Sequence, residues 1–448
     1  MKVPEKLQLL GKVISAIKAH GHAVSRLIAE EMEYKPAIFD VQGTAEPVRD
    51  EDDFTPLPII PEGPTINFQA FIDGVQRTTP VYWVSLEKLG TQVPVHVGHI
   101  AVGVVLRDNT GKLRCKFDFI KDRLLILMPL TGMERAGFEG TSLLRELIDE
   151  GNLIPDSQVA EDPISAFNIE KEVGPIVLCD TTFSGLEESM REDDLKELDR
   201  NPERVKKGAG ALLVDELLYN TGRVRSRAQG RVNTIRQILE MLVVTKFREV
   251  YGREIYVLVD GPLFFMGKWL RKHDVLGGLR EVEREKFVLK NAVGLVKSLR
   301  GRPKEMMHLR NILCMAEGER SPLMKIADAV DIGSSETFVK PHMTTYLRLR
   351  SPPEGLSLPS PVGIVRVDLH VSTIGCDNTD QVKCMSKEEE EALLGPIVRG
   401  IRRERWPSVT DKGRMFTQVF PISETERMLH ARLYSSRELA YIYSIFRT

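Results

Sequence analysis

The chain has 448 residues, of which 42% are hydrophobic and 28% are charged, and its formal net charge at pH 7 is −2. This length suits one large domain with extensions or two to three ordinary domains, and the composition is that of a globular protein. No apolar run approaches the ~18–20 residues that cross a membrane, and the N-terminus lacks the apolar core of a signal peptide. Five cysteines without metal-type spacing agree with a reducing compartment, so we expect a cytoplasmic protein with no membrane partner.

The first 65 residues divide into two parts. Apolar residues recur at helical spacing through residues 1–34 and predict an N-terminal helical arm, with the helix over 4–34. Residues 35–65 are rich in proline and acidic residues, which predicts an extended linker.

From residue 66 onward, strand patterns alternate with helical ones. The expected strands include 66–74, 81–89, 96–108, 123–130, 175–183, 254–260, 292–299, 344–350 and 363–372. The expected helices include 184–199, one or two over 205–250, 265–275, 282–291, 386–403, 422–434 and 435–446. This order predicts an α/β fold in which a mixed β-sheet is flanked by helices.

Charged residues gather in blocks although the net charge is small. Acidic residues cluster at 45–53, 187–199 and 387–391, and basic residues at 223–236, 297–310, 340–350 and 399–414. Such blocks are commonly solvated helix faces, but basic ones can also line a groove that binds a polyanion.

Two segments combine an apolar run with Asp-Gly. They are QAFIDGVQR, which contains Asp73, and YVLVDGPLF, which contains Asp260. Asp-Gly after a strand is a common turn, so each alone can be purely structural. Together they predict two carboxylates at the rim of one sheet.

Glu240 is a third candidate carboxylate. It lies twenty residues before Asp260 on a predicted helix, four residues after Arg236. The simplest interpretation is an ordinary helix ion pair. Packing of this helix against the strand that ends at Asp260 would instead bring Glu240 to the same rim. Three such carboxylates suit Mg²⁺ or Mn²⁺, and two ions about 3.5–4 Å apart can promote phosphodiester hydrolysis.

Several other residues compete for a functional role. Asp180 also ends a predicted strand, Asp368 and His370 share one strand face, and the Asp215-Glu216 pair lies in an apolar helix. His96 and His99 form a weaker candidate metal pair, because no further ligand accompanies them in sequence.

Five segments, in this order, resemble the NurA nucleases, a family with an RNase H-like core that works with the HerA hexameric ATPase. The segments are FIDG, IRQILE, LVDGPL, VGLVKSLR and VFPISETERMLHARLYS. Val75, Phe420 and Leu429 depart from the family's usual Ser, Tyr and Ala. The resemblance covers roughly residues 66–448, which would form the nuclease domain, and the long spacing between the first two Asp-Gly motifs indicates an insertion within 110–205.

The resemblance implies which residues act. Its metal ligands fall on Asp73, Glu240, Asp260 and His430, which together with Lys297 would form the catalytic set with two Mn²⁺ or Mg²⁺ ions. Lys297 and Arg300 would lie near the scissile phosphate, and Arg236 and Arg348 are further expected DNA contacts. A homodimer around a DNA channel and a HerA-type partner are implied in the same way.

Two other classes stay open. A restriction-like endonuclease would need a compact Asp…Glu-x-Lys strand motif, and EKFVLK has a helical pattern instead. A non-catalytic DNA scaffold or accessory subunit of a DNA motor would use the Asp-Gly segments only as turns. The chain has no GxxxxGK[ST] segment, so ATP hydrolysis is expected from a partner.

Overall fold

The computed structural model describes residues 55–168, 174–183, 214–297, 306–327, 342–351, 361–405 and 416–435, with short pieces at 8, 10–12, 15, 44–47, 170, 186 and 438–439. Most of the predicted arm at 1–34 lies outside the described residues, as do the predicted helix 184–199 and most of the one at 435–446.

The described elements alternate between strands and helices, as expected. The strands are β1 (Thr44–Pro47), β2 (Leu57–Pro58), β3 (Ala70–Leu86), β4 (Thr91–Arg107), β5 (Leu113–Cys115), β6 (Lys121–Met128), β7 (Leu153–Pro155), β8 (Ile176–Asp180), β9 (Val257–Asp260), β10 (Ala292–Val296), β11 (Glu319–Arg320), β12 (Met324–Ala327), β13 (His342–Arg348) and β14 (Ile364–His370). The α-helices are α2 (Leu130–Arg135), α3 (Thr141–Asp149), α4 (Asp156–Glu161), α5 (Pro163–Phe167), α7 (Val214–Tyr219), α8 (Thr221–Tyr251), α9 (Leu263–Lys272), α10 (Glu281–Leu289), α11 (Met306–Leu313), α12 (Thr379–Lys383), α13 (Lys387–Arg403) and α14 (Phe420–His430). Short 3₁₀ turns occur at Glu87–Leu89, Phe117–Phe119 and Val371–Ile374.

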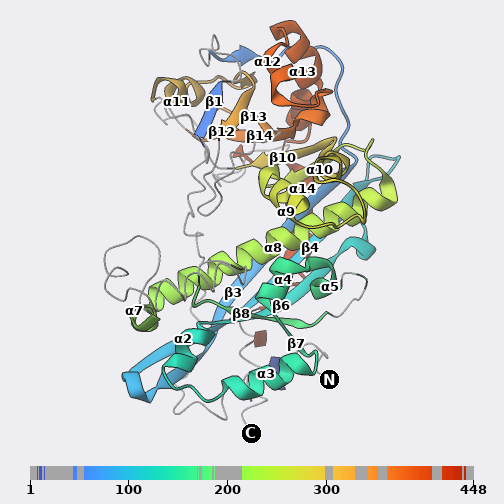
Figure 1. Ribbon diagram of the computed structural model, residues 1–448. Helices are drawn as coiled ribbons and strands as arrows, with labels where there is room; N and C mark the ends of the chain where they lie inside the picture. Colours follow the sequence, from blue (N-terminus) through green and yellow to red (C-terminus); the bar gives the residue numbers. More distant parts are fainter. Residues whose placement is uncertain are drawn as a thin grey trace.

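These strands join into one mixed sheet, which confirms the predicted α/β class (Figure 1). Along it the order is β1-β12-β13-β14-β10-β9-β3-β4-β6-β8-β7. At its centre, β3, β4 and β6 are antiparallel neighbours, whereas β9 pairs parallel with both β3 and β10. The parallel pairs bring the C-terminal ends of β9 and β10 to the same edge, beside β3.

Helices cover both faces of the sheet. The long helix α8 crosses one face diagonally in Figure 1 and buries Ile235 and Leu239 against Ile72 and Val102. The opposite face is covered by α13, which contributes Leu394, Ile397, Val398 and Ile401 to a second core, and by α14. Side chains alternate along a strand, so neighbouring residues of β3 point to different helices.

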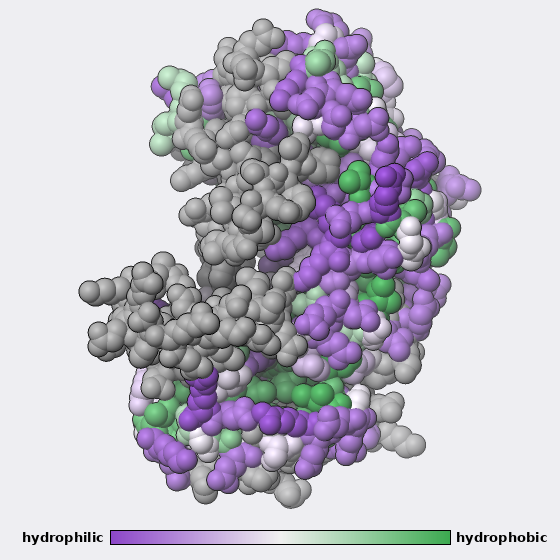
Figure 2. Space-filling view, in the orientation of Figure 1, coloured by the Kyte–Doolittle hydropathy of each residue, from purple (hydrophilic) through white to green (hydrophobic). Residues whose placement is uncertain are grey.

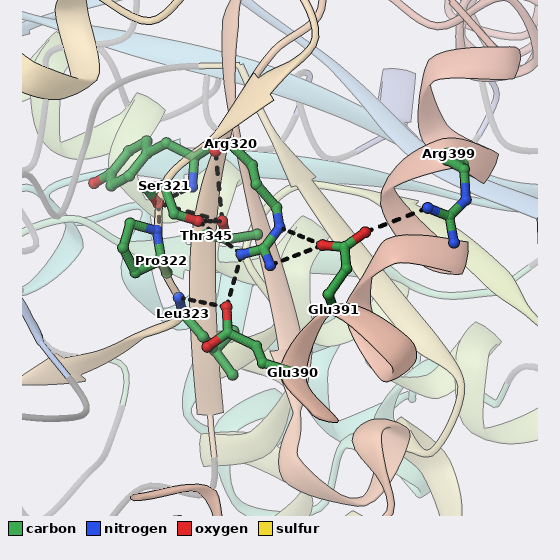
Figure 3. A network of polar contacts seen from close by, with 9 residues as sticks. Arg320, Ser321, Pro322, Leu323, Thr345, Glu390, Glu391 and Arg399 are labelled. Carbon is green, nitrogen blue, oxygen red and sulfur yellow. Dashed lines mark hydrogen bonds and ion pairs between the residues drawn. The ribbon is translucent and has the colours of Figure 1, made fainter. Parts of the chain in front are cut away.

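A buried ion network fixes α13 to the sheet (Figure 3). The Arg320 guanidinium donates to Glu390 Oε1 at 2.7 Å and to Glu391 Oε2 at 3.0 Å, and Glu391 also accepts from Arg399 at 3.3 Å. Arg399 in turn donates to the carbonyl of Pro64 at 2.9 Å. The acidic block at 387–391 therefore includes structural anchors, while Glu389 completes a capping box with Ser386 at the start of α13.

The segment predicted as a linker contributes strands instead of standing apart from the domain. Within 35–65, β1 pairs antiparallel with β12, and β2 pairs with β11. Proline suits both strands because each is short, and the local composition does not reveal the sheet edge available to them.

Two further expectations concern β3 and the surface. The expected strands 66–74 and 81–89 fall on one strand, β3, which pairs with β4 on both sides of a register shift between Pro80 and Tyr82. The face in view in Figure 2 is mostly hydrophilic, with apolar side chains gathered low in the view. Among the described residues, no helix has both the length and the apolar character needed to cross a membrane.

Candidate active site

Asp73 and Asp260 lie on neighbouring parallel strands at the same level. Ile72 pairs with Val259, and the two aspartates are the next residue along each strand. Asp73 shares a strand face with Phe71 and Val75, and so points toward α13 and α14. The predicted turn after Asp73 is wrong, because β3 continues to Leu86. The predicted turn after Asp260 is confirmed: Gly261 has φ +117°, a conformation open to glycine, and α9 begins at Leu263.

Glu240 reaches this place from α8, on the opposite face of the sheet. Its carboxylate lies against Gly74, where a Cβ would collide with Glu240 Oε1. Arg236 forms an ion pair with Glu240 and donates to Gly74 O at 3.1 Å and to Gln76 Oε1 at 3.0 Å. Arg236 therefore positions Glu240 on β3 in this structure, and most of its donors are used by the protein itself.

Lys297, immediately after β10, completes the central group. Its Nζ lies 2.9 Å from Asp260 Oδ2, and the two side chains are 17% and 22% exposed. Burial alone would lower the pKa of Lys297, but the carboxylates of Asp260 and Asp73 outweigh burial and raise this pKa above its usual value. Lys297 is thus a charged ammonium that is held by the carboxylates.

The carboxylates themselves repel one another. Burial raises the pKa of Asp73 well above its usual value; Asp260 raises it further, Lys297 lowers it, and Glu426 and Glu240 add smaller increases. Burial likewise raises the pKa of Glu240 to about 7, with Arg236 opposing this shift and Asp260 supporting it. Asp73 Oδ1 accepts from the amide of Gly74 at 2.7 Å, but its buried Oδ2 has no hydrogen-bond partner. Among the described residues, Lys297 and Arg236 therefore do not offset the combined effect of burial and neighbouring carboxylates on the pKa values of Asp73 and Glu240.

His430 lies at the C-terminal end of α14, and this helix packs against β3 and β9. Its imidazole is 47% exposed, and Nε2 lies 3.6 Å from Glu426 Oε1, one helical turn earlier. Glu426 was not among the predicted residues. The local signal that would have found it is the four-residue spacing between Glu426 and the predicted His430. Phe420, at the start of α14, is 38% exposed.

One predicted DNA contact, Arg348, lies away from this group. Arg348 is completely buried on β13. Its guanidinium donates to the carbonyl of Val362 at 2.5 Å and to the carbonyl of Leu313 at 2.7 Å. The prediction that Arg348 contacts DNA is therefore wrong, because β13 lies between other strands and its arginine is enclosed in the core. Arg300 lies outside the described residues.

The competing acidic residues have partners of their own. Asp180 accepts from the amide and hydroxyl of Thr131 and from the amide of Thr182, as a turn cap does. Asp368 is held by Arg366 through two hydrogen bonds of 2.8 and 2.9 Å. Asp215 and Glu216 lie on α7, and their side chains lie outside the described set.

The candidate histidines also have separate environments. His370 Nδ1 faces Ser372 Oγ at 2.7 Å, and burial lowers the pKa of His370 to about 3. His96 and His99 are an odd number of residues apart on β4 and so point to opposite faces. Burial lowers the pKa of His96 to about 3, while His99 Nδ1 accepts from the amide of Tyr434 at 3.0 Å.

The central group has the donor chemistry of a divalent-cation site. Carboxylate oxygens are the ligands that Mg²⁺ and Mn²⁺ prefer, and the unpartnered, buried Oδ2 of Asp73 is an oxygen that a cation would satisfy. Among the described residues, no three His, Cys, Asp or Glu side chains already surround one point closely enough to hold an ion. The residues therefore fit a metal by chemistry and charge, while the Lys297 ammonium supplies the positive charge beside Asp260.

No protein-family model matches this sequence, and no curated protein matches it significantly. The resemblance to the NurA nucleases therefore depends on the five sequence segments alone.

Proposed function

We propose that this chain is a Mn²⁺- or Mg²⁺-dependent deoxyribonuclease with an RNase H-like core. One observation carries the proposal: the carboxylates of Asp73 and Asp260, on adjacent parallel strands, and of Glu240, on the helix that crosses the other face, lie close enough to act on one another's charge. Carboxylates that repel one another in this way destabilise a fold, so their proximity favours a role in which a cation joins them.

The centre of the sheet supports the RNase H-like part of this proposal. Three antiparallel strands, β6-β4-β3, are continued by the parallel strands β9 and β10, with α8 between the two sets in the chain. This order and the packing of α8 over β3 and β4 are the observations that support such a core. Strands β3 and β9 lie side by side, and each carries one of the aspartates.

Each side chain has a proposed task in phosphodiester hydrolysis. Asp73, Glu240 and Asp260 would hold the cations, and Arg236 keeps Glu240 against β3. Divalent cations, when bound, activate a water and stabilise the leaving oxygen. Lys297 Nζ, at the rim of the group, would turn its ammonium toward the scissile phosphate when a cation replaces it beside Asp260. His430 Nε2 would hold or transfer a proton at the exposed side of the site.

The remaining parts of the proposal come from the resemblance. Arg300 would contact the DNA backbone beside Lys297, two chains would enclose the DNA, and a HerA-type hexameric ATPase would move it. DNA-end processing is proposed on the same basis, whereas a cytoplasmic location is proposed from the five cysteines without metal-type spacing.

A nuclease assay tests the proposal. Linear duplex and single-stranded DNA would be incubated with wild type, Asp260→Asn and the control Asp380→Asn in Mn²⁺ or in EDTA. Asp380 is an exposed residue of α12, paired with Lys383. We expect cleavage by wild type and by the control in Mn²⁺ only, and at least a hundredfold loss in Asp260→Asn. Metal-dependent activity retained in that variant would refute the site.

A non-catalytic DNA scaffold is the second candidate. It is favoured by the ready-made ion pair of Lys297 with Asp260, which supplies a counter-charge without any metal. A scaffold would bind DNA equally well in EDTA and Mn²⁺ and would leave it intact, so a binding measurement beside the cleavage assay separates the two classes.

A further inference from the structure

Helix α14 brings one more carboxylate to the acidic group. It packs on the face of the sheet to which Asp73 points. Gly103 is the cross-strand partner of Asp73, and Leu429 lies directly over it, 2.9 Å from the position a Cβ would occupy. The absence of a side chain at Gly103 therefore lets α14 approach the sheet closely beside Asp73.

Glu426, one turn before Leu429 and His430, is held on the inner side of α14. Its side chain is 13% exposed, and Oε2 accepts from the side-chain amide Nε2 of Gln418 at 3.1 Å. Its neighbour Glu424 pairs with the outward-facing Arg427 at 2.7 Å instead. The two glutamates thus lie in different environments, and only Glu426 acts electrostatically on Asp73 and on Lys297.

Glu426 adds to the negative charge around Asp73. Among the described residues, the carboxylates of Asp260, Glu426 and Glu240 all act on the charge of Asp73, and Lys297 opposes them. The buried Oδ2 of Asp73, without a hydrogen-bond partner among the described residues, is an oxygen that a bound cation would satisfy.

We propose that Glu426 is a fourth carboxylate of this site, and that with it the free protein binds a divalent cation on the α14 side of Asp73. The proposal rests on the proposed cation-dependent function. Glu426 also holds His430 at the rim, through the contact between Oε1 and Nε2.

The test measures binding of Mn²⁺ alone, by titration calorimetry and by the loss of the free-ion spin-resonance signal, without DNA. Wild type should bind Mn²⁺. Glu426→Gln, which preserves size and the contact with Gln418, should bind at least tenfold more weakly. The matched control Glu424→Gln, two residues away on the same helix, should bind as wild type does.

Melting temperatures supply a second measurement, because a purely structural role of Glu426 would predict a different result. In EDTA, Glu426→Gln should melt at the same temperature as wild type or a higher one, because one repelling charge is gone. On addition of Mn²⁺, its melting temperature should rise less than that of wild type. Equal Mn²⁺ affinity in wild type and Glu426→Gln would overturn the proposal. Glu426-dependent Mn²⁺ binding in a chain that cleaves no DNA would support it while refuting the nuclease function.

Discussion

Lys297 Nζ lies 2.9 Å from Asp260 Oδ2, so a predicted phosphate-binding lysine and a predicted metal ligand neutralise each other in the protein alone. The pair joins the residue after β10 to the end of β9, and both side chains are largely buried. A cation that binds Asp260 must compete with this ammonium. The competition should make Lys297 contribute less to stability with metal than without it.

Replacement of Lys297 by methionine should therefore destabilise the chain in EDTA, by about 2 kcal/mol, because it leaves largely buried carboxylates without a counter-charge. In Mn²⁺ the loss should shrink, since the ion takes over that charge. Urea unfolding in both buffers measures the difference. Lys383→Met, at an exposed pair with Asp380, is the control and should change neither curve measurably. An equal loss in both buffers would contradict competition between Lys297 and the metal.

Stability in EDTA should depend on pH through Glu240. Burial raises its pKa from 4.5 to about 7 in the folded chain. Below pH 4.5 the residue is protonated in both folded and unfolded chains. As pH rises from 4.5 through 7, the unfolded chain ionises first, so the folded chain loses stability by about 3 kcal/mol from this group.

Glu240→Gln removes this contribution, so the variant should gain stability relative to wild type as the pH rises from 4.5 to 8. Chemical unfolding at both pH values in EDTA measures the gain. Mn²⁺ should abolish it, because a bound cation keeps Glu240 ionised at no such cost. A constant difference between variant and wild type across this range would show that Glu240 is not desolvated as the structure indicates.

Elements that depend on local signals were more predictable from the sequence than the pairing between strands. The strand ending at Asp260 and the helix carrying Glu240 were both predicted, because the apolar periodicity and the Gly261-Pro262 turn are local signals. Asp73 was wrongly placed at a strand end. Its Asp-Gly favours a turn locally, but pairing with β4 extends β3 to Leu86 and outweighs that preference.

Residues whose role depends on tertiary position were not predictable in the same way. Arg348 lies in a basic block, and nothing in that block shows that β13 is enclosed between other strands. Glu426 was overlooked because the face that α14 turns to the sheet is set by Leu429 packing over Gly103, a contact between residues more than 300 positions apart. Charge blocks alone do not distinguish such positions from solvated helix faces.

The anchoring network of α13 should be important for stability and irrelevant to cleavage. Arg320→Met would leave Glu390 as a buried charge without its partner, which costs about 3–5 kcal/mol (Figure 3). Arg280→Met, at an exposed pair with Glu283, is the control and should be neutral. Unfolding curves give the loss, and DNA cleavage well below the melting temperature should match wild type. A neutral Arg320→Met would show that the network contributes nothing.

Gly74 offers a test of the site that changes no charged residue. A methyl group at this position would collide with Glu240 Oε1 and lie 3.0 Å from Arg236 Nη1. Gly74 lies within β3 and is not among the residues with positive φ, so its backbone accepts alanine. Gly74→Ala should therefore displace the Glu240 carboxylate from β3, lowering both Mn²⁺ affinity and DNA cleavage at least tenfold.

The control for this change is Gly222→Ala, because a Cβ in that first turn of α8 meets only Asn220 Oδ1, at 3.4 Å. It should bind Mn²⁺ and cleave DNA as wild type does, with equal or greater stability, since alanine favours the helix. Gly74→Ala and Glu240→Gln should also show the same reduced Mn²⁺ affinity when combined as when separate, because both act through one carboxylate. Additive losses would mean that Gly74 affects the site by a route other than Glu240.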